Sequence, residues 1–228
     1  MHKLKMKLPW KQKRLKAEQE KQSQVAARAI EIIREATPPQ GRAIFIDCGF
    51  NTRDVFDKYY QALGNRFEYV GFEIQTTLWE KARESREYQN PPVEFIHAGV
   101  SDKNGEVYYY EPRKWFLNYK GGATLLKEKQ DRTMDKVVDK VVTINFSDFL
   151  ADQYQTDDFI VVKMDIEGAE YDVLQKIIAD GRLNYINLLF VEFHQQYLTS
   201  SPDRDWARMH QTIIAQLNAS SVQYYDWI

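Results

Sequence analysis

The sequence predicts an α/β fold, with a mostly parallel β-sheet and helices on both of its faces. Short apolar runs rich in isoleucine, valine and phenylalanine alternate with longer stretches of helical periodicity, which is the spacing of βαβ units. The runs show no polar alternation, as expected of strands buried on both faces. The 228 residues are 43% hydrophobic and 28% charged, which suits a single domain with one substantial core.

The first predicted strand, residues 43–47, lies between two predicted helices. The helix before it carries apolar residues at helical spacing over 25–33 and ends before Pro38, because a residue that precedes proline is disfavoured in the α conformation. The helix after it spans 52–63, with Thr52 as its N-cap. The remaining predicted strands are 67–72, 93–100, 137–144, 159–165, 186–193 and 222–228. The remaining predicted helices are 76–88, 169–179 and 205–217.

Two segments interrupt this alternation. Asn104-Gly105 is a two-residue hairpin signal, because both positions tolerate positive φ, and the aromatic run 106–110 favours a local antiparallel excursion. Residues 115–135 have no clear period, and segments of this length in a compact domain are often lids or binding loops. We interpret residues 115–135 as the substrate-side loop.

Charge is distributed unevenly along the chain. Residues 1–22 hold seven lysines and one arginine against two glutamates, a net charge of +6, so the formal total of −2 leaves −8 on the rest. We therefore divide the chain into a basic leader with its helix, residues 1–40, and a main domain, residues 41–228. The leader could make a weak contact with an anionic membrane surface, or it could be a solvated approach to the first helix. The acidic body argues against a broad nucleic-acid surface.

Cysteine content and hydropathy predict the compartment. The single cysteine, Cys48, cannot form an internal disulfide. The sequence shows neither a cleavable signal pattern nor an apolar run of roughly 18 residues that could span a bilayer. We expect a reducing, cytoplasmic location.

Acidic residues and a glycine stand where predicted strands end, which is where open parallel sheets bind ligands. Gly49 lets the backbone approach a ligand, Asp47 offers a carboxylate, and Glu73 lies near the spacing at which a second-strand acid holds a ribose diol. These residues indicate a nucleoside cofactor. Asn51 and Asp54 stand where the glycines of a dinucleotide motif would be, so a mononucleoside such as S-adenosylmethionine fits better than a nicotinamide or flavin.

The segment KMDIEGAE, Lys163 to Glu170, concentrates charge at a predicted strand-to-helix junction. Three carboxylates and a lysine are costly to place together unless they bind something, because like charges raise each other's pKa and burial adds to the effect. The alternative is structural, with Glu170 favoured by the dipole of the following helix.

Six segments resemble those of the FkbM-type family of S-adenosylmethionine-dependent methyltransferases, in the family's order. They are FIDCGFN (45–51), YVGFE (69–73), AGVSDKNGEV (98–107), GGATLL (121–126), KMDIEGAE (163–170) and FVEFH (190–194). The resemblance covers roughly residues 41–195. It implies a Rossmann-like sheet of seven strands with the last one antiparallel, and methyl transfer usually to an oxygen of a sugar or polyketide-type molecule. The family usually has a second glycine near the position of Thr52-Arg53.

These observations define three sets of expected site residues. Cofactor contacts are expected from Asp47, Gly49, Asn51, Glu73, Ser101 and Asp165. Substrate contacts are expected from Lys163, Glu167 and Glu170. Catalytic roles are expected for Asp165, Glu192 and His194.

Methyl transfer to a hydroxyl of a sugar or glycan-type acceptor requires that the hydroxyl proton be removed. His194 is the candidate base, because an imidazole pKa near 6.5 suits neutral pH, and Asp165 and Glu192 would orient it or the substrate. Alternatively, Asp165, Glu167, Glu192 and His194 bind a magnesium or manganese ion that polarises the acceptor oxygen. The sequence does not choose between these mechanisms, and no metal ligand is assigned.

Two other functions stay open. A nucleoside-binding partner subunit without catalysis would keep the cofactor site but would not need the acidic segment or His194. A methyltransferase acting on a protein or another small molecule would differ in its acceptor. For nitrogen acceptors a strand would end in an Asn/Asp-Pro-Pro-aromatic motif, whereas Asn90-Pro91-Pro92 here precedes a strand and is followed by Val93.

Overall fold

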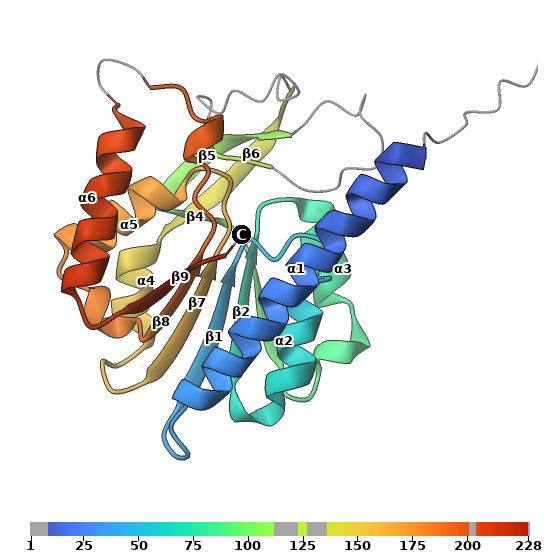
Figure 1. Ribbon diagram of the computed structural model, residues 1–228, viewed down its shortest axis with the longest axis vertical. Coiled ribbons are helices and arrows are strands. Elements are labelled where there is room, and N and C mark those ends of the chain that lie inside the picture. The colour runs from blue at the N-terminus through green and yellow to red at the C-terminus, as the bar shows by residue number, and fades with distance from the viewer. Residues whose placement is uncertain (1–8, 112–122, 127–135, 201–203, 228) are drawn as a thin grey trace, which may run out of the picture.

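A computed structural model describes residues 9–111, 123–126, 136–200 and 204–227. Its centre is a six-stranded sheet in the order β3-β2-β1-β7-β8-β9, in which all five neighbouring pairs are parallel. The strands are β1 (Ala43–Cys48), β2 (Glu68–Glu73), β3 (Val93–His97), β7 (Phe159–Met164), β8 (Leu188–Val191) and β9 (Gln223–Asp226). The α/β prediction is thus confirmed (Figure 1).

The strand count implied by the family resemblance is wrong for this sheet. The described residues place six strands in it, not seven, and β9 runs parallel to β8. The reason is the connection between them: a helix, α6 (Trp206–Ala219), carries the chain back along the sheet before β9 begins. A helical crossover of this kind returns the next strand in the same direction, whereas an antiparallel neighbour can follow a short hairpin.

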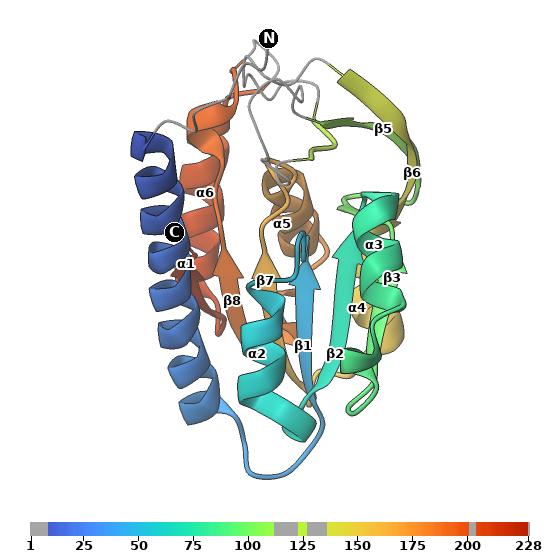
Figure 2. The same cartoon turned by 90° about the vertical axis from the view of Figure 1, so that its right-hand side faces the viewer.

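Helices cover both faces of the sheet: one group lies on each side of it in Figure 1, and Figure 2 looks onto one of these faces. One face is covered by α1 (Pro9–Ala36) and α2 (Phe56–Leu63), whose apolar side chains pack with Phe45 and Val161. The other face is covered by α4 (Phe146–Gln153), α5 (Glu170–Ala179) and α6, which pack with Ile44, Ile46 and Val162. Side chains that alternate along one strand therefore enter two separate cores.

The basic leader and the first predicted helix form one element from residue 9 onward. Helix α1 runs without interruption from Pro9 to Ala36. Its second half is anchored by Ala26, Ala29 and Ile33, each at most 2% exposed. Because most helical stability in proteins comes from such packing, this half fixes the position of the helix.

A second, three-stranded sheet lies at the carboxyl edge of the first. It consists of β4 (Gly99–Ser101), β6 (Lys136–Asn145) and β5 (Gly105–Glu111), with β6 in the middle. Asn104-Gly105 therefore lies between β4 and β5, which both pair with β6. The predicted hairpin at this turn is replaced by an antiparallel pair of β5 with β6, which comes later in the chain. The Asn104 side chain accepts a hydrogen bond from the Asn145 backbone N–H, which fixes the turn between β4 and β5 against the end of β6. Of the predicted substrate-side loop, residues 115–122 and 127–135 lie outside the described residues.

Several element boundaries differ from the sequence prediction. The predicted strand 93–100 is divided between β3 and β4, which belong to different sheets. The predicted helix 76–88 is shorter in the structure, where α3 spans Thr76–Arg83 and a short 3₁₀ turn follows it. Helix α2 starts at Phe56, and the Thr52 hydroxyl bonds to Asp54 instead of capping it. Helix α4 was not anticipated, although Asn145 caps it through hydrogen bonds from the N–H groups of the next turn.

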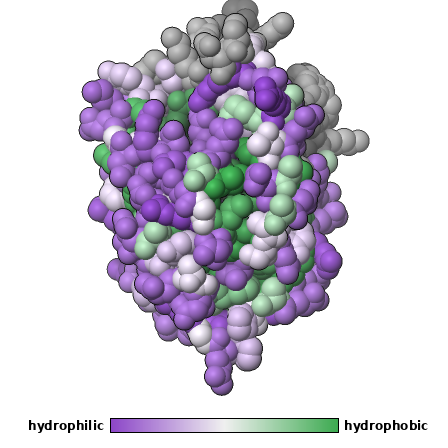
Figure 3. All heavy atoms as spheres, turned by 90° about the vertical axis from the view of Figure 1, so that its left-hand side faces the viewer, coloured by the Kyte–Doolittle hydropathy of each residue, from purple (hydrophilic) through white to green (hydrophobic). Residues whose placement is uncertain are grey.

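Among the described residues, no helix is long and apolar enough to cross a membrane. Figure 3 shows one face of the molecule, on the side of α6 in Figure 1, where hydrophilic side chains predominate and hydrophobic ones gather near the middle.

Candidate active site

The carboxyl ends of the strands surround a cleft. Its empty volume, open mouth included, is about 520 Å³. Its lining has an apolar part and a polar part. The apolar wall is formed by Phe72, Ile74, Ala98, Val100, Leu125 and Ile166. The polar and backbone-lined part is formed by Gly49, Asn51, Glu73, Gln75, Asp165 and Glu167.

The loop after β1 approaches the loop after β7 very closely. Gly49 has a φ of +89°, and a Cβ atom there would lie 2.3 Å from the backbone oxygen of Asp165. Only glycine fits such a position. Further along the loop, Asn51 and Arg53 have φ angles of +53° and +71°. Arg53 thus has the left-handed backbone conformation that favours glycine, near the position where the family usually has its second glycine.

Glu73 ends β2 and faces this loop. Its two carboxylate oxygens accept hydrogen bonds from the backbone N–H groups of Asn51 (2.9 Å) and Gln75 (2.8 Å). Burial raises the pKa of Glu73 to about 7, against the lowering effect of these hydrogen bonds. The side-chain oxygen of Asn51 is buried and has no hydrogen-bond partner among the described residues. A buried acceptor without a partner is costly unless a ligand supplies the donor.

Asp47 and Lys163 form a buried ion pair beside the cleft. They are register partners on β1 and β7, so their side chains share one face of the sheet. The Lys163 ammonium lies 3.0 Å from Asp47 Oδ1, and the two side chains are 3% and 1% exposed. Burial opposes the charge of Lys163, but the negative charges of Asp47 and Asp165 outweigh it and raise the lysine pKa. Neither residue lines the cleft, although sequence reasoning placed Asp47 on the cofactor and Lys163 on the substrate.

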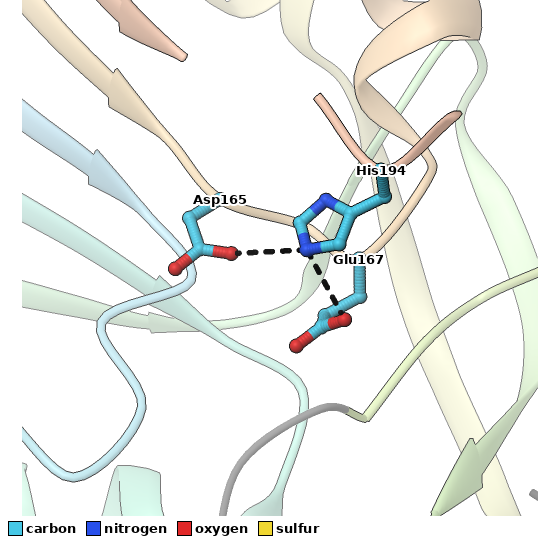
Figure 4. A group of neighbouring side chains, drawn as sticks. All are labelled: Asp165, Glu167 and His194. Carbon is cyan, nitrogen blue, oxygen red and sulfur yellow. Dashed lines mark ion pairs between the residues drawn. The ribbon is translucent and has the colours of Figure 1, made fainter. Parts of the chain in front are cut away.

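His194 is the centre of an acidic cluster that extends to the cleft (Figure 4). Its Nε2 atom lies 3.3 Å from Glu167 Oε2, 3.7 Å from Glu192 Oε1 and 3.8 Å from Asp165 Oδ1. One ligand atom each from Asp165, Glu167 and His194 lie within 4.8 Å of one another, which is a spacing that can hold a metal ion. These residues come from the loops after β7 and β8, which the sheet brings together.

Glu170 holds the imidazole from the other side. This carboxylate is 0% exposed, lies 3.0 Å from His194 Nδ1, and accepts the backbone N–H groups of His194 and Gly168. Burial alone would lower the pKa of His194, but the hydrogen bond to Glu170 and the nearby negative charges outweigh it and raise the pKa. Glu170, predicted to contact substrate, is therefore placed to orient the histidine.

Glu192 and Glu167 complete the acidic side. Burial and the charge of Asp165 raise the pKa of Glu192 to about 7, although His194 and Lys163 act in the opposite direction. Glu167 has a φ of +58°, which is uncommon for a residue with a side chain and is often found at functional sites.

Sequence reasoning missed the residue that connects the second sheet to this cluster. The Thr124 hydroxyl donates to the backbone oxygen of Glu167 (2.7 Å), while the Thr124 backbone pairs with Tyr110 of β5. Thr124 belongs to the GGATLL motif, but nothing in the neighbouring sequence indicates that its hydroxyl binds the backbone of Glu167. Ser101 ends β4, where its hydroxyl bonds to Asp102. The cleft wall stops one residue before it, at Val100.

The fold and the cleft together define an α/β enzyme of the Rossmann-like class, with a ligand site at the carboxyl edge of its sheet. A family model, the methyltransferase FkbM domain, matches residues 47–219. The chain therefore belongs to the FkbM methyltransferase family. Neither the curated proteins nor the solved structures contain a match to it.

Proposed function

We propose that this protein transfers a methyl group from S-adenosylmethionine to a hydroxyl of a sugar or glycan-type acceptor. The observation that carries the proposal is the junction of two sites in one cleft. One part, called the cofactor part below, holds Glu73 and Asn51, and the acidic cluster around His194 adjoins it through Asp165 and Glu167.

The residues present fit the cofactor. The carboxylate of Glu73 retains acceptor capacity for a ribose diol, because its two backbone hydrogen bonds use only part of its lone pairs. Asn51 offers a buried oxygen without a donor. The apolar wall suits a flat base, and the acidic rim suits the positive charge of a sulfonium. When bound, the cofactor supplies an activated methyl group on sulfur.

The acidic cluster supplies what the acceptor requires. In the transfer, the carbon–sulfur bond breaks as a carbon–oxygen bond forms, and the hydroxyl proton must leave. His194 Nε2 is oriented toward the cluster by Glu170 and can take that proton. Asp165, Glu167 and Glu192 are 27%, 18% and 23% exposed, so they can accept hydrogen bonds from a polyhydroxylated molecule.

The proposal is tested by cofactor binding and by transfer of label. The melting temperature should rise with S-adenosylmethionine and with its demethylated product, because a ligand that binds the native state stabilises it. Incubation with methyl-labelled cofactor and a panel of sugars and glycans should transfer label to an oxygen. No thermal shift and no calorimetric heat with either nucleoside would refute the cofactor assignment.

His194→Ala separates chemistry from binding. We expect turnover to fall by about 10²- to 10⁴-fold, the usual contribution of a general base, with cofactor affinity little changed. Equal loss of both would mean that His194 supports the cofactor site instead. A protein that binds cofactor but labels nothing in the panel, with or without the substitution, would favour the catalytically silent partner subunit.

A further inference from the structure

The acidic cluster concentrates negative charge around a single imidazole. Four carboxylates surround His194: Asp165, Glu167, Glu170 and Glu192. Among the ion pairs of the described residues, Lys163 lies 3.8 Å from Asp165 but is closer to Asp47, at 3.0 Å. Partly buried like charges at this separation repel each other unless a proton or a cation lies among them.

The imidazole is directed into this charge. Both hydrogen bonds of the ring, to Glu170 and to the Glu192 carbonyl oxygen, are made through Nδ1. The opposite atom, Nε2, faces three carboxylates, and the side chain is only 4% exposed. A buried carboxylate on Nδ1 is the usual arrangement behind a metal-bound histidine, because it fixes the ring and leaves Nε2 free to bind.

We propose that Asp165, Glu167 and His194, with Glu192 beside them, bind a divalent cation of the magnesium and manganese class. Carboxylate oxygens with a single imidazole suit these ions, whereas zinc sites are commonly richer in histidine or cysteine. Neighbouring ligands about 2.1 Å from such an ion lie roughly 3 Å apart. The distances of 3.3, 3.7 and 3.8 Å from Nε2 to the three carboxylates reach that value by side-chain rotation.

The position of the site gives the cation a role, which rests on the proposed function. Asp165 and Glu167 line the cleft, so a cation between them lies at the border of the cofactor part and the open acidic part. Its charge would lower the pKa of an acceptor hydroxyl there and hold a sugar diol in place. With Nε2 bound to the cation, His194 does not take the hydroxyl proton. The hydroxyl, with its pKa lowered by the cation, releases that proton to water in the open cleft.

The test uses the full-length protein, stripped with a chelator and titrated with manganese without any nucleoside. We expect one saturable ion per chain by electron paramagnetic resonance, with a nitrogen coupling in the spin-echo spectrum that is lost in His194→Ala. Asp165→Asn and Glu167→Gln should weaken binding at least tenfold. Glu170→Gln, which keeps the side chain's shape, should weaken it about 10- to 100-fold, as for other partners of metal-bound histidines.

Glu106→Gln is the matched control, because it removes an exposed carboxylate from β5 and should leave manganese affinity unchanged. Each variant is compared at a temperature well below its measured melting point, so that unfolding cannot imitate lost binding. Absence of saturable binding, or equal affinity in wild type, Asp165→Asn and His194→Ala, would overturn the proposal. Manganese binding without nucleoside binding would support this site and refute the proposed function. Nucleoside binding without manganese binding would support the proposed function and refute this site.

Discussion

The Asp47–Lys163 ion pair and the acidic cluster around His194 lie side by side at the carboxyl edge of one sheet, yet they differ in how their charges are balanced. The Asp47–Lys163 pair is almost fully buried and has one carboxylate for one ammonium. The cluster around His194 joins four carboxylates to one imidazole and opens into the cleft. Asp165 belongs to both, because it faces Lys163 with one oxygen and His194 with the other.

The difference separates a structural role from a ligand-binding role. A charge that is neutralised within the fold positions its neighbours, whereas carboxylates that open into a cleft are accessible to a ligand. Two substitutions test this distinction and a third tests the cofactor contact of Glu73, from the largest expected effect to the smallest.

Lys163→Met should have the largest effect on stability. It leaves Asp47 buried without its partner, and breaking a buried ion pair from one side costs about 3–5 kcal/mol of unfolding free energy. Urea unfolding at neutral pH measures the loss. The double variant Asp47→Leu/Lys163→Met should recover most of it, because replacing both charges by apolar groups is often neutral. If the single variant were as stable as wild type, the ion pair would not stabilise the contact between β1 and β7.

Glu73→Ala should weaken binding of S-adenosylmethionine by about 1.5–3 kcal/mol if its carboxylate holds the ribose hydroxyls through charge-assisted hydrogen bonds. Calorimetry measures the affinity. With the pKa of Glu73 raised from 4.5 to about 7, the folded protein keeps a proton that the unfolded chain releases, so this group's contribution to stability falls as pH rises from 4.5 to 7. Ligand affinity should change in the opposite sense and increase through pH 7. A Glu73→Gln variant that kept the same pH dependence would exclude this carboxylate as its source.

Glu192→Gln should have the smallest effect, and with the opposite sign to Lys163→Met. The pKa of Glu192 is raised to about 7, which means that its charged form is disfavoured in the folded state. At pH 8 the substitution should therefore leave the unfolding free energy unchanged or raise it by roughly 1 kcal/mol or less. At pH 5, where the wild-type side chain is mostly protonated in the fold, the gain should disappear. A loss of several kcal/mol at pH 8 would place Glu192 among the structural charges.

The sequence predicted the elements whose signal is local. Apolar runs such as 43–47 and 159–165 became the central strands, because a strand buried on both faces needs no partner to be recognised. Helix α4 was missed because it begins directly after the last residue of β6, so no loop marks its start in the sequence. The predicted strand 93–100 is two strands, β3 and β4, which separate at Ala98 and join different sheets. This division could not be predicted locally, because β4 pairs with β6, some forty residues later.

The site followed the same rule. The strand ends supplied Gly49, Glu73 and Asp165, which line one cleft as topology requires. The roles of Lys163 and Glu170 could not be inferred, because each depends on a partner far away in the chain. Lys163 meets Asp47 through the register of β1 with β7, and Glu170 meets His194 across two loops.

The absence of a side chain at Gly49 makes the cofactor part and the acidic part share one wall. Because the Asp165 carbonyl oxygen lies only 2.3 Å from where a Cβ atom of Gly49 would be, the loops after β1 and β7 are in direct backbone contact, and neither can shift without the other. Directed evolution toward a new acceptor therefore has little freedom at this wall. It would instead have to act through other side chains that line the cleft, Leu125 among them.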